Sequence, residues 1–286
     1  MNSNLNLALI QQPATDDRQL NVNRGLDAAR QAAADGAQVI AFAELAFEPF
    51  YPQCRAEPGF EGLAEPIPGP ITDAFCQLAA ELGVVIAINL FEHAGQDADG
   101  RPRTFDASPV IDADGSLLGV TRMLHITDYE GFHEKGYYTP GDSGVPVYST
   151  RFGRLGIAIC YDRHYPEYMR ALALAGADVV LVPQAGSVGE WPEGLYEAEM
   201  RVAAFQNGYY VGLCNRVGPE DRLEFAGESF VCDPRGVVLA RAGQGTTEIL
   251  HCQLDLSQLN DCPARKLFLT DRRPDLYADW FRDRSE

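Results

Sequence analysis

Lysine is almost absent from this sequence of 286 residues: Lys135 and Lys266 are the only two, and arginine supplies the rest of the 23 basic residues. Acidic residues number 41, which gives a net charge of −18. Such a surface repels phosphate backbones and anionic membranes, so we expect neither nucleic-acid nor membrane partners. Any mechanism that requires a lysine has only these two candidates.

Long apolar runs and paired cysteine motifs are also absent. No window of about 18 apolar residues occurs, and no basic segment precedes an apolar stretch at the N-terminus. We therefore expect a cytoplasmic protein. The seven cysteines form no Cys-x-x-Cys pair and the five histidines lack ligand spacing, so we expect no disulfide framework, no metal and no cofactor.

Apolar runs alternate with helical patterns along the chain, and 46% of the residues are hydrophobic. No linker interrupts them, so we expect one domain over residues 1–286. The patterns predict strands at 5–11, 38–44, 84–91, 108–112, 117–124, 154–160, 178–183, 209–215, 229–233, 236–241 and 248–255. They predict helices at 18–35, 70–82, 165–175 and 192–207, each followed by a glycine that can adopt a left-handed conformation.

Two patterns recur in the same order in both halves of the chain. GAQVIAFAE at 36–44 resembles GADVVLVPQ at 176–184, and a hairpin at 108–120 resembles another at 229–241. The central strands are continuous apolar runs, which is typical of sheets covered on both faces. Two similar halves predict an α/β fold, a four-layer αββα sandwich of two mixed sheets covered by helices. Alternatively, the hairpins match by chance.

Three features place polar chemistry at the ends of apolar runs. Cys160 ends RLGIAIC and precedes the polar YDRHYPE, so it is either a nucleophile beyond the carboxyl end of a strand or an inert core thiol. Glu44 ends VIAFAE, where burial would raise its pKa towards that of a general base; the alternative is a solvated strand end. The loop 121–141, with Glu134 and Lys135, forms either solvent cover or an active-site wall.

In order and spacing, FAELAF around Glu44, GFHEKGYYTPGD around Glu134 and GIAICYDRHYPE around Cys160 resemble the nitrilase superfamily of carbon–nitrogen hydrolases. The resemblance covers nearly the whole chain, from ALIQ near residue 8 to DRRPDLY near the end. It implies an αββα sandwich and hydrolysis of a non-peptide C–N bond through a Cys160 thioester. Glu44 would be the general base and Glu134 would help to position base and substrate. The backbone N–H of Tyr161 could donate to the oxyanion.

One position departs from the family pattern. The family's lysine, two residues before a histidine, is replaced here by Met123, whose thioether donates no hydrogen bond. Losing one oxyanion donor typically costs on the order of 3 kcal/mol. Three hypotheses follow: Lys135 or Arg122 reaches the oxyanion, the enzyme is slower or acts on an easier substrate, or the protein is a binding or regulatory homologue that has lost turnover.

The residues beside the nucleophile bear on the substrate. CYDRHYPE resembles the pattern of β-ureidopropionases and N-carbamoyl-amino-acid amidohydrolases, in which Arg163 would bind a substrate carboxylate, with Tyr161 and His164 beside it. GFHEKGYYTPGDSG and DRRPDLY also resemble N-carbamoylputrescine amidases, whose cationic substrate would suit Glu190 and the other glutamates of GEWPEGLYEAEM. Alternatively, these glutamates lie on a solvated helix face.

These patterns favour an N-carbamoyl amino acid as the small-molecule substrate, with release of ammonia. N-carbamoylputrescine-type compounds and ω-amides are the alternatives. The resemblance also implies a homodimer or larger homo-oligomer in which segments 165–176 and 192–207 pair across an axis, as isologous symmetry favours.

Overall fold

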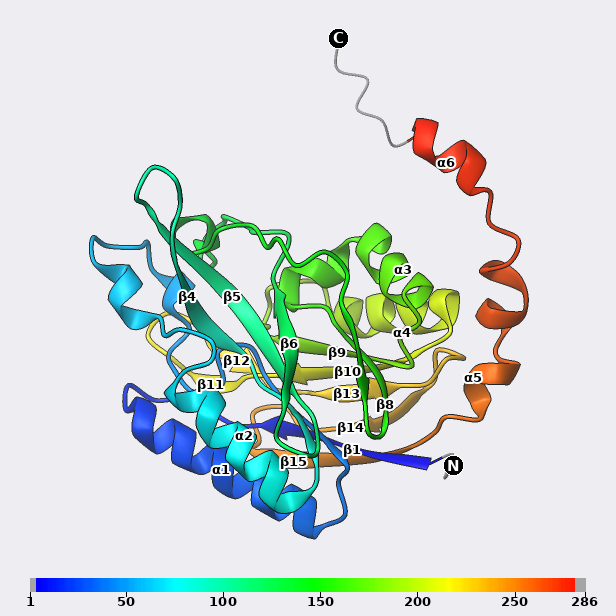
Figure 1. The fold of residues 1–286 in the computed structure, drawn as a ribbon, viewed down its shortest axis with the longest axis horizontal. Helices are drawn as coiled ribbons and strands as arrows, with labels where there is room; N and C mark the ends of the chain where they lie inside the picture. Colours follow the sequence, from blue (N-terminus) through cyan, green and yellow to red (C-terminus); the bar gives the residue numbers. More distant parts are fainter. Residues whose placement is uncertain (1–3, 281–286) are drawn as a thin grey trace.

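The computed structural model describes residues 4–280 and has two large β-sheets packed face to face, with helices on their outer sides, and a small two-stranded sheet (Figure 1). This is the predicted four-layer αββα sandwich. The strands are β1 Asn4–Gln11, β2 Val39–Phe42, β3 Val85–Ala87, β4 Leu90–Gln96, β5 Pro102–Ile111, β6 Leu117–Arg122, β7 Val147–Thr150, β8 Gly153–Ile157, β9 Val179–Gln184, β10 Tyr210–Asn215, β11 Val217–Pro219, β12 Glu224–Ala226, β13 Phe230–Cys232, β14 Val238–Arg241 and β15 Glu248–Asp255. The α-helices are α1 Arg18–Ala34, α2 Pro70–Leu82, α3 Pro166–Leu174, α4 Leu195–Asn207, α5 Gln258–Asp261 and α6 Pro274–Trp280. The short 3₁₀ turns η1 to η4 cover Tyr51–Gln53, Phe60–Leu63, Glu134–Gly136 and Cys160–His164, and the π-helical turn η5 covers Ala264–Phe268.

The two sheets share a unit of five strands. The first sheet has the order β15-β1-β2-β3-β5-β4, with β6 also paired to β5, and the second has the order β14-β13-β10-β9-β8-β7. In the first sheet β1, β2 and β3 are parallel and are followed by the antiparallel hairpin β5–β6. In the second, β8, β9 and β10 are parallel and are followed by the hairpin β13–β14. The recurring sequence patterns therefore mark a repeated structural unit.

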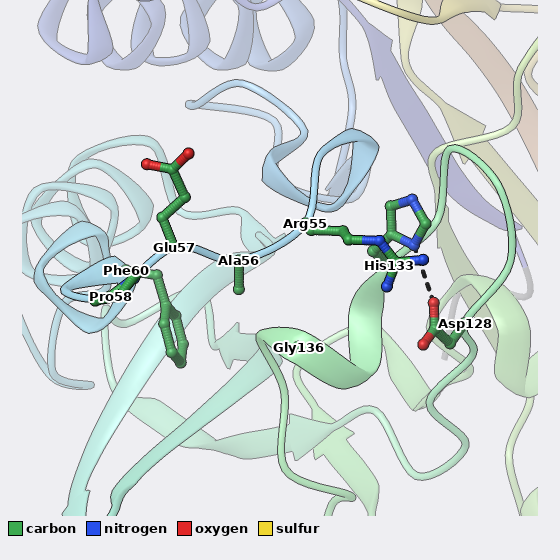
Figure 2. A pocket seen from close by; sticks show the side chains of 8 residues that line it. All are labelled: Arg55, Ala56, Glu57, Pro58, Phe60, Asp128, His133 and Gly136. Atoms are coloured by element: carbon green, nitrogen blue, oxygen red, sulfur yellow. Dashed lines mark hydrogen bonds and ion pairs between the residues drawn. The ribbon is translucent and has the colours of Figure 1, made fainter.

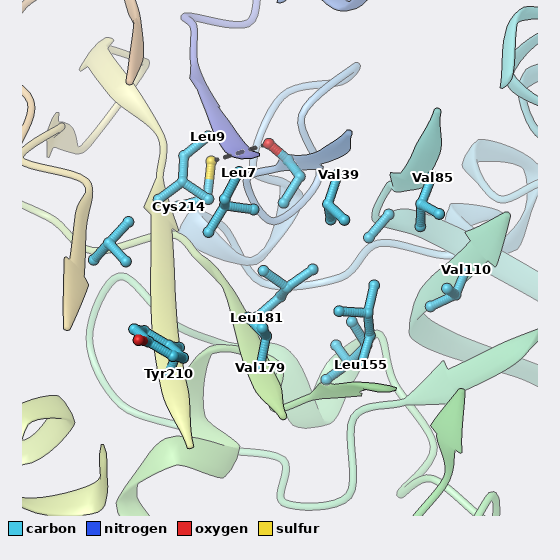
Figure 3. Packing of buried hydrophobic residues seen from close by; sticks show 14 of the residues in the cluster. Leu7, Leu9, Val39, Val85, Val110, Leu155, Val179, Leu181, Tyr210 and Cys214 are labelled. Atoms are coloured by element: carbon cyan, nitrogen blue, oxygen red, sulfur yellow. Dashed lines mark hydrogen bonds between the residues drawn. The ribbon is translucent and has the colours of Figure 1, made fainter. Parts of the chain in front are cut away.

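The interface between the sheets is an apolar layer. Side chains of both sheets meet there (Figure 3), and those labelled in the view are Leu7, Leu9, Val39, Val85, Val110, Leu155, Val179, Leu181, Tyr210 and Cys214. Gly212 on β10 marks a close approach, because a Cβ atom there would lie 3.1 Å from Leu7 and 3.3 Å from Leu9. The central strands face this layer on one side and the helices on the other, so both of their faces are buried. This explains their continuous apolar runs.

The helices cover the outer faces of the sheets. Helices α1 and α2 bury apolar residues against the first sheet, and α3 and α4 against the second. Asp17 begins α1 by accepting a hydrogen bond from the Leu20 N–H at 2.9 Å. Helices α2 and α4 end at Gly83 and Gly208, which have φ of 68° and 71°. Within the part of the chain that the structure describes, no helix has the length and apolarity needed to cross a bilayer.

The structure differs from the sequence-based strand predictions at the ends that carry polar side chains. The run 84–91 is divided into β3 and β4 at Asn89. The side chain of Asn89 accepts a hydrogen bond from the Leu45 N–H and donates one to the Asp106 carboxyl group. Strand β8 ends at Ile157, whereas the predicted strand reached residue 160. Helix α4 starts at Leu195 and not at residue 192, because Gly194 has a left-handed φ of 79°. The first half of β5 and the strands β4, β7, β11 and β12 lack a clear apolar run and were not predicted as separate strands.

Candidate active site

The Cys160 thiol lies at the junction between β8 and the polar turn η4. The residue is only 4% exposed and has a φ of 42°, a left-handed conformation that is costly for a residue with a side chain. The Arg163 guanidinium donates to the Cys160 carbonyl oxygen at 2.9 Å and holds this turn. Gln184, at the end of β9, donates from Nε2 to the Cys160 sulfur at 3.2 Å.

Two carboxyl groups face this thiol from the other elements. Glu44 follows β2, Glu134 begins η3, and both residues are fully buried. Ligating atoms of Glu44, Glu134 and Cys160 all lie within 4.8 Å of one another, and residues 4–280 contain no other cluster of three such groups this close. The sheet packing thus brings together the three residues that the strand-end patterns and the resemblance singled out.

Burial decides the protonation of this cluster. Burial and, after it, the nearby Glu134 carboxyl raise the pKa of Glu44, hydrogen bonds that involve Asp106 and Cys160 lower it, and the net result is a pKa of about 7. Burial also raises the pKa of Cys160 well above its usual range, and the Glu44 and Glu134 charges add to this effect. The resting sulfur is therefore a neutral thiol, and a carboxyl group that titrates near neutral pH lies next to it.

Arginine and histidine side chains hold the segments that carry these groups. The buried Arg216 donates to the carbonyl oxygens of Glu44, at 2.9 Å, and of Leu45, which fixes the chain directly after β2. Asp162 of η4 accepts hydrogen bonds from the backbone N–H of Leu124 and from both the backbone and the ring of His125. The segment after β6 is therefore fastened to the turn that carries Cys160.

The structure does not support the hypotheses in which Lys135 or Arg122 replaces the family lysine. The Lys135 side chain is exposed, and its charge acts on Asp128, whose pKa is lowered mainly by a hydrogen bond with His133. The Arg122 guanidinium is held by Glu92, at 2.6 and 2.7 Å, and by Asp142 at 2.8 Å. Met123 itself is fully buried in the same apolar cluster as Cys160.

The predicted substrate-binding residues lie around the Cys160 turn. Arg163 is 4% exposed, stacks over the Tyr196 ring and faces the Glu199 carboxylate at 3.4 Å. His164 is hydrogen-bonded to the same Glu199 at 2.7 Å, and the Tyr161 ring packs edge-on against the His164 ring.

Glu190 approaches this turn from the chain after β9. It accepts hydrogen bonds from the Tyr129 hydroxyl at 2.5 Å, from Tyr196 and from the Ser187 N–H. Its charge raises the pKa of Cys160, together with the larger effects of burial, Glu44 and Glu134. The Glu190 carboxylate is therefore fixed near the thiol by three hydrogen bonds and is not part of a solvated helix face.

Three buried residues near the cluster were missed by the sequence analysis: Gln184, Asp106 and Tyr138. Gln184 is the counterpart of Glu44 in the recurring pattern, so the repeat itself could have identified it. Asp106 lies inside β5, and the Tyr138 hydroxyl is buried without a hydrogen-bond partner among the described residues. No simple motif marks either position.

The cavity in Figure 2 lies beside the segment that carries Glu134. It has a volume of about 390 Å³, and its lining residues come from the loop after η1 and from the segment around η3: Arg55, Ala56, Glu57, Pro58, Phe60, Asp128, His133 and Gly136. The His133 ring and the Asp128 carboxylate interact at 3.0 Å in this wall. None of Glu44, Glu134 and Cys160 lines the cavity, so it is separate from the buried cluster.

Comparison with known proteins places this site in a family. Residues 6–264 match the model of the carbon-nitrogen hydrolase family. The chain is 36% identical to an N-carbamoylputrescine amidase of Solanum lycopersicum over 95% of this chain and 93% of the relative. A crystal structure of a carbon-nitrogen hydrolase from Helicobacter pylori superposes with a TM-score of 0.88 at 30% identity, covering 98% of this chain and 99% of that one. An amidase mutant from Nesterenkonia sp., whose active-site cysteine carries the acetamide moiety of fluoroacetamide, superposes with a TM-score of 0.77 at 27% identity and 96% coverage of both chains. The protein therefore belongs to the carbon–nitrogen hydrolases of the nitrilase superfamily and acts on non-peptide C–N bonds.

Proposed function

We propose that the protein hydrolyses the N-carbamoyl group of a small amine, with Cys160 as the nucleophile and Glu44 as the general base. The observation that carries this proposal is the convergence of a buried thiol and two buried carboxyl groups within 4.8 Å. The covalently modified cysteine of the Nesterenkonia amidase supports a role for the thiol.

The proposed reaction has two steps. Glu44 takes the Cys160 proton while the sulfur attacks the carbamoyl carbon, and the C–N bond breaks as the leaving nitrogen accepts this proton and departs as ammonia. Water then attacks the thioester carbon and gives its proton to Glu44. The C–S bond breaks, the thiol is regenerated, and the released carbamic acid decomposes to the amine and carbon dioxide.

The oxyanion of each step needs a donor other than lysine. The Tyr161 N–H is the backbone donor next to the nucleophile, in the turn that the Arg163 guanidinium holds. Glu134 accepts a hydrogen bond from the Thr127 N–H at 3.2 Å, which leaves its other oxygen free to position the substrate's amide group.

The charges around the thiol favour a substrate with a cationic end. Glu44, Glu134 and Glu190 raise the pKa of Cys160, and Arg163 is the cation that opposes them. Since Glu199 already faces Arg163, little positive charge is left for a substrate carboxylate. We therefore favour an N-carbamoyl amine of the N-carbamoylputrescine type over the N-carbamoyl amino acid that the sequence alone favoured, with Glu190 facing the ammonium group.

Ammonia release from three compounds tests this proposal. N-carbamoylputrescine, N-carbamoyl-β-alanine and N-butylurea present a cationic, an anionic and a neutral end to the wild type and to Cys160→Ala. We expect the cationic compound to have the highest kcat/KM and the Ala variant to release no ammonia. Turnover by Cys160→Ala at the wild-type rate would refute the thiol mechanism.

Variants of two glutamates test the substrate end. Glu190→Gln should reduce the preference for the cationic over the neutral compound by about tenfold, the equivalent of about 1.4 kcal/mol. Glu193→Gln is the matched control, because Glu193 is exposed on the same segment. A preference for the anionic compound that is lost in Arg163→Met would instead establish the N-carbamoyl amino acid.

We also propose a single domain that forms a homodimer through α3 and α4. Leu174, Val202 and Phe205 on these helices are exposed by 50%, 51% and 38%, which suits an isologous contact. Sedimentation velocity of the wild type and of Val202→Glu tests this, since the charged variant should shift to the monomer. The cytoplasmic location stays a prediction.

A further inference from the structure

Asp106 is a buried carboxyl group that the proposed reaction does not use. It lies inside β5, is fully buried, and accepts a hydrogen bond at Oδ1 from the Asn89 Nδ2 at 2.6 Å. Within residues 4–280, its second oxygen and both oxygens of Glu44 lack a conventional donor. Three buried carboxyl oxygens without donors need an explanation, because each would cost stabilisation if it stayed unpaired.

Asn89 sets the position of this group relative to Glu44. Its Oδ1 accepts the N–H of Leu45, the residue after Glu44, at 2.7 Å, while its Nδ2 donates to Asp106. One side chain thus links the end of β2 to the middle of β5. The carboxyl groups of Asp106 and Glu44 are close enough for each to shift the pKa of the other.

A hydrogen bond between two carboxyl groups requires one proton. Two carboxylates in contact in a buried site cannot both be ionised, so the pair holds one proton over a wide range of pH. Burial raises the pKa of Asp106 well above its usual range, and the Glu44 charge raises it further. The hydrogen bond with Asp106 instead lowers the pKa of Glu44, against the larger effect of burial. Asp106, whose pKa both burial and the Glu44 charge raise, is therefore the more easily protonated member of the pair.

The position without a lysine is next to this pair. Met123 donates its backbone N–H to the Asp106 carbonyl oxygen at 2.9 Å, and its side chain brings no charge into the site. The charged and titratable groups that face the pair are Arg216, Glu134 of η3, Cys160 and Asp162 of η4, and Tyr138.

We propose that Asp106 carries a proton and donates it in a hydrogen bond to the Glu44 carboxylate, so that a neutral acid keeps the proposed base ionised in a site that has Met123 in place of a lysine. Asp106 is a positioning residue: its proton stays in place while Glu44 accepts and returns the proton of the Cys160 thiol. The inference rests on the proposed role of Glu44 as the base. It does not depend on the identity of the substrate.

Alkylation of Cys160 by iodoacetamide tests the pair without any substrate. In this reaction the sulfur displaces iodide while its proton passes to Glu44, so the rate should rise with pH as Glu44 ionises. Peptide mass spectrometry gives the rate for Cys160, and the half-buried Cys54 serves as an internal reference. The proteins are the wild type, Asp106→Leu, Asp106→Asn, Glu44→Gln and Ser108→Ala.

Asp106→Leu removes the donor, so the midpoint of the rise should move up by about 1 pH unit, and the rate at pH 6 should fall about tenfold. Asp106→Asn keeps an N–H donor and should retain the wild-type midpoint. Ser108→Ala removes the other acceptor of Asn89, at 3.0 Å, and should also leave the midpoint unchanged. Thermal unfolding checks that each variant is folded.

A folded Asp106→Leu variant with the wild-type midpoint would overturn the proposal, as would an equal shift in Asp106→Asn. If alkylation of Glu44→Gln follows the same pH dependence as the wild type, Glu44 is not the base and the proposed function fails first. A flat profile in Glu44→Gln together with an unshifted Asp106→Leu would refute the carboxyl pair alone.

Discussion

Met123→Lys tests how the missing cation shapes the site. Methionine and lysine have unbranched side chains of similar length, so the substitution places an ammonium group near the buried carboxyl cluster with little change in packing. The Met123 backbone is bonded to Asp106, and the next residue is bonded to Asp162 of the Cys160 turn. The new charge therefore enters between these segments.

The size of the effect follows from the charges. For an assumed separation of about 8 Å from the Glu44 carboxylate, an ammonium contributes about 2 kcal/mol at an effective dielectric constant of about 20. This corresponds to a decrease of about 1.5 units in the pKa of Glu44. Since burial and Glu134 raise that pKa to about 7 in the native site, the midpoint of the Lys variant should lie between about 5 and about 6.

The assay is the pH dependence of ammonia release and of Cys160 alkylation, with Met123→Gln as the neutral polar control. A folded Lys variant whose midpoint stays at pH 7, or an equal shift in the Gln variant, would refute the electrostatic argument. The plateau rate gives independent information. A rise approaching about 100-fold would mean that the native site lacks one oxyanion donor, and an unchanged plateau would mean that another group already donates.

Three further predictions follow from the buried cluster and its support. Because the pKa of Glu44 rises from 4.5 to about 7 on folding, the folded state binds the extra proton between these values, and Glu44 reduces stability as pH increases through this range. Glu44→Gln should therefore raise the free energy of unfolding by about 3 kcal/mol at pH 8 and leave it nearly unchanged at pH 4, as urea titration can measure; equal effects at both pH values would contradict this. Gln184→Leu removes the hydrogen bond to the Cys160 sulfur and should slow alkylation about tenfold without lowering the melting temperature by more than a few degrees, and an unaltered rate would show that the bond does not orient the thiol. Gly212→Val forces side-chain atoms against Leu7 and Leu9 between the sheets and should cost about 1–3 kcal/mol of unfolding free energy, whereas an equally stable variant would mean that the sheets can separate slightly at no cost.

The sequence predicted the polar ends of the strands better than the polar residues within them. Glu44 and Cys160 were found because each closes a continuous apolar run, and the sandwich brings these ends together. Gln184 closes such a run too, but an amide shows no obvious chemistry until its 3.2 Å contact with the sulfur is known. Asp106 and Asn89 lie inside or between strands, where only tertiary structure reveals their pairing.

The role of a charged side chain in or next to the loop after β6 was harder to predict, because closeness in the sequence does not show which way a side chain points. Lys135 follows Glu134 directly, yet Glu134 is buried and Lys135 is exposed. Arg122 precedes Met123, yet it forms ion pairs with Glu92 and Asp142. Adjacent side chains in a strand or turn can point to opposite sides of the backbone. The composition of the loop does not predict which of them points into the site.

The packing of the two sheets has a consequence for inactivation. Glu44, the proposed base, follows a strand of the first sheet and the Cys160 thiol follows a strand of the second, so their separation depends on the apolar layer between the sheets. A displacement of one sheet by an ångström would separate the reacting groups while each sheet keeps its hydrogen bonds. Catalysis should therefore fail at a lower temperature or denaturant concentration than secondary structure, which makes activity a sensitive reporter of contact between the two halves.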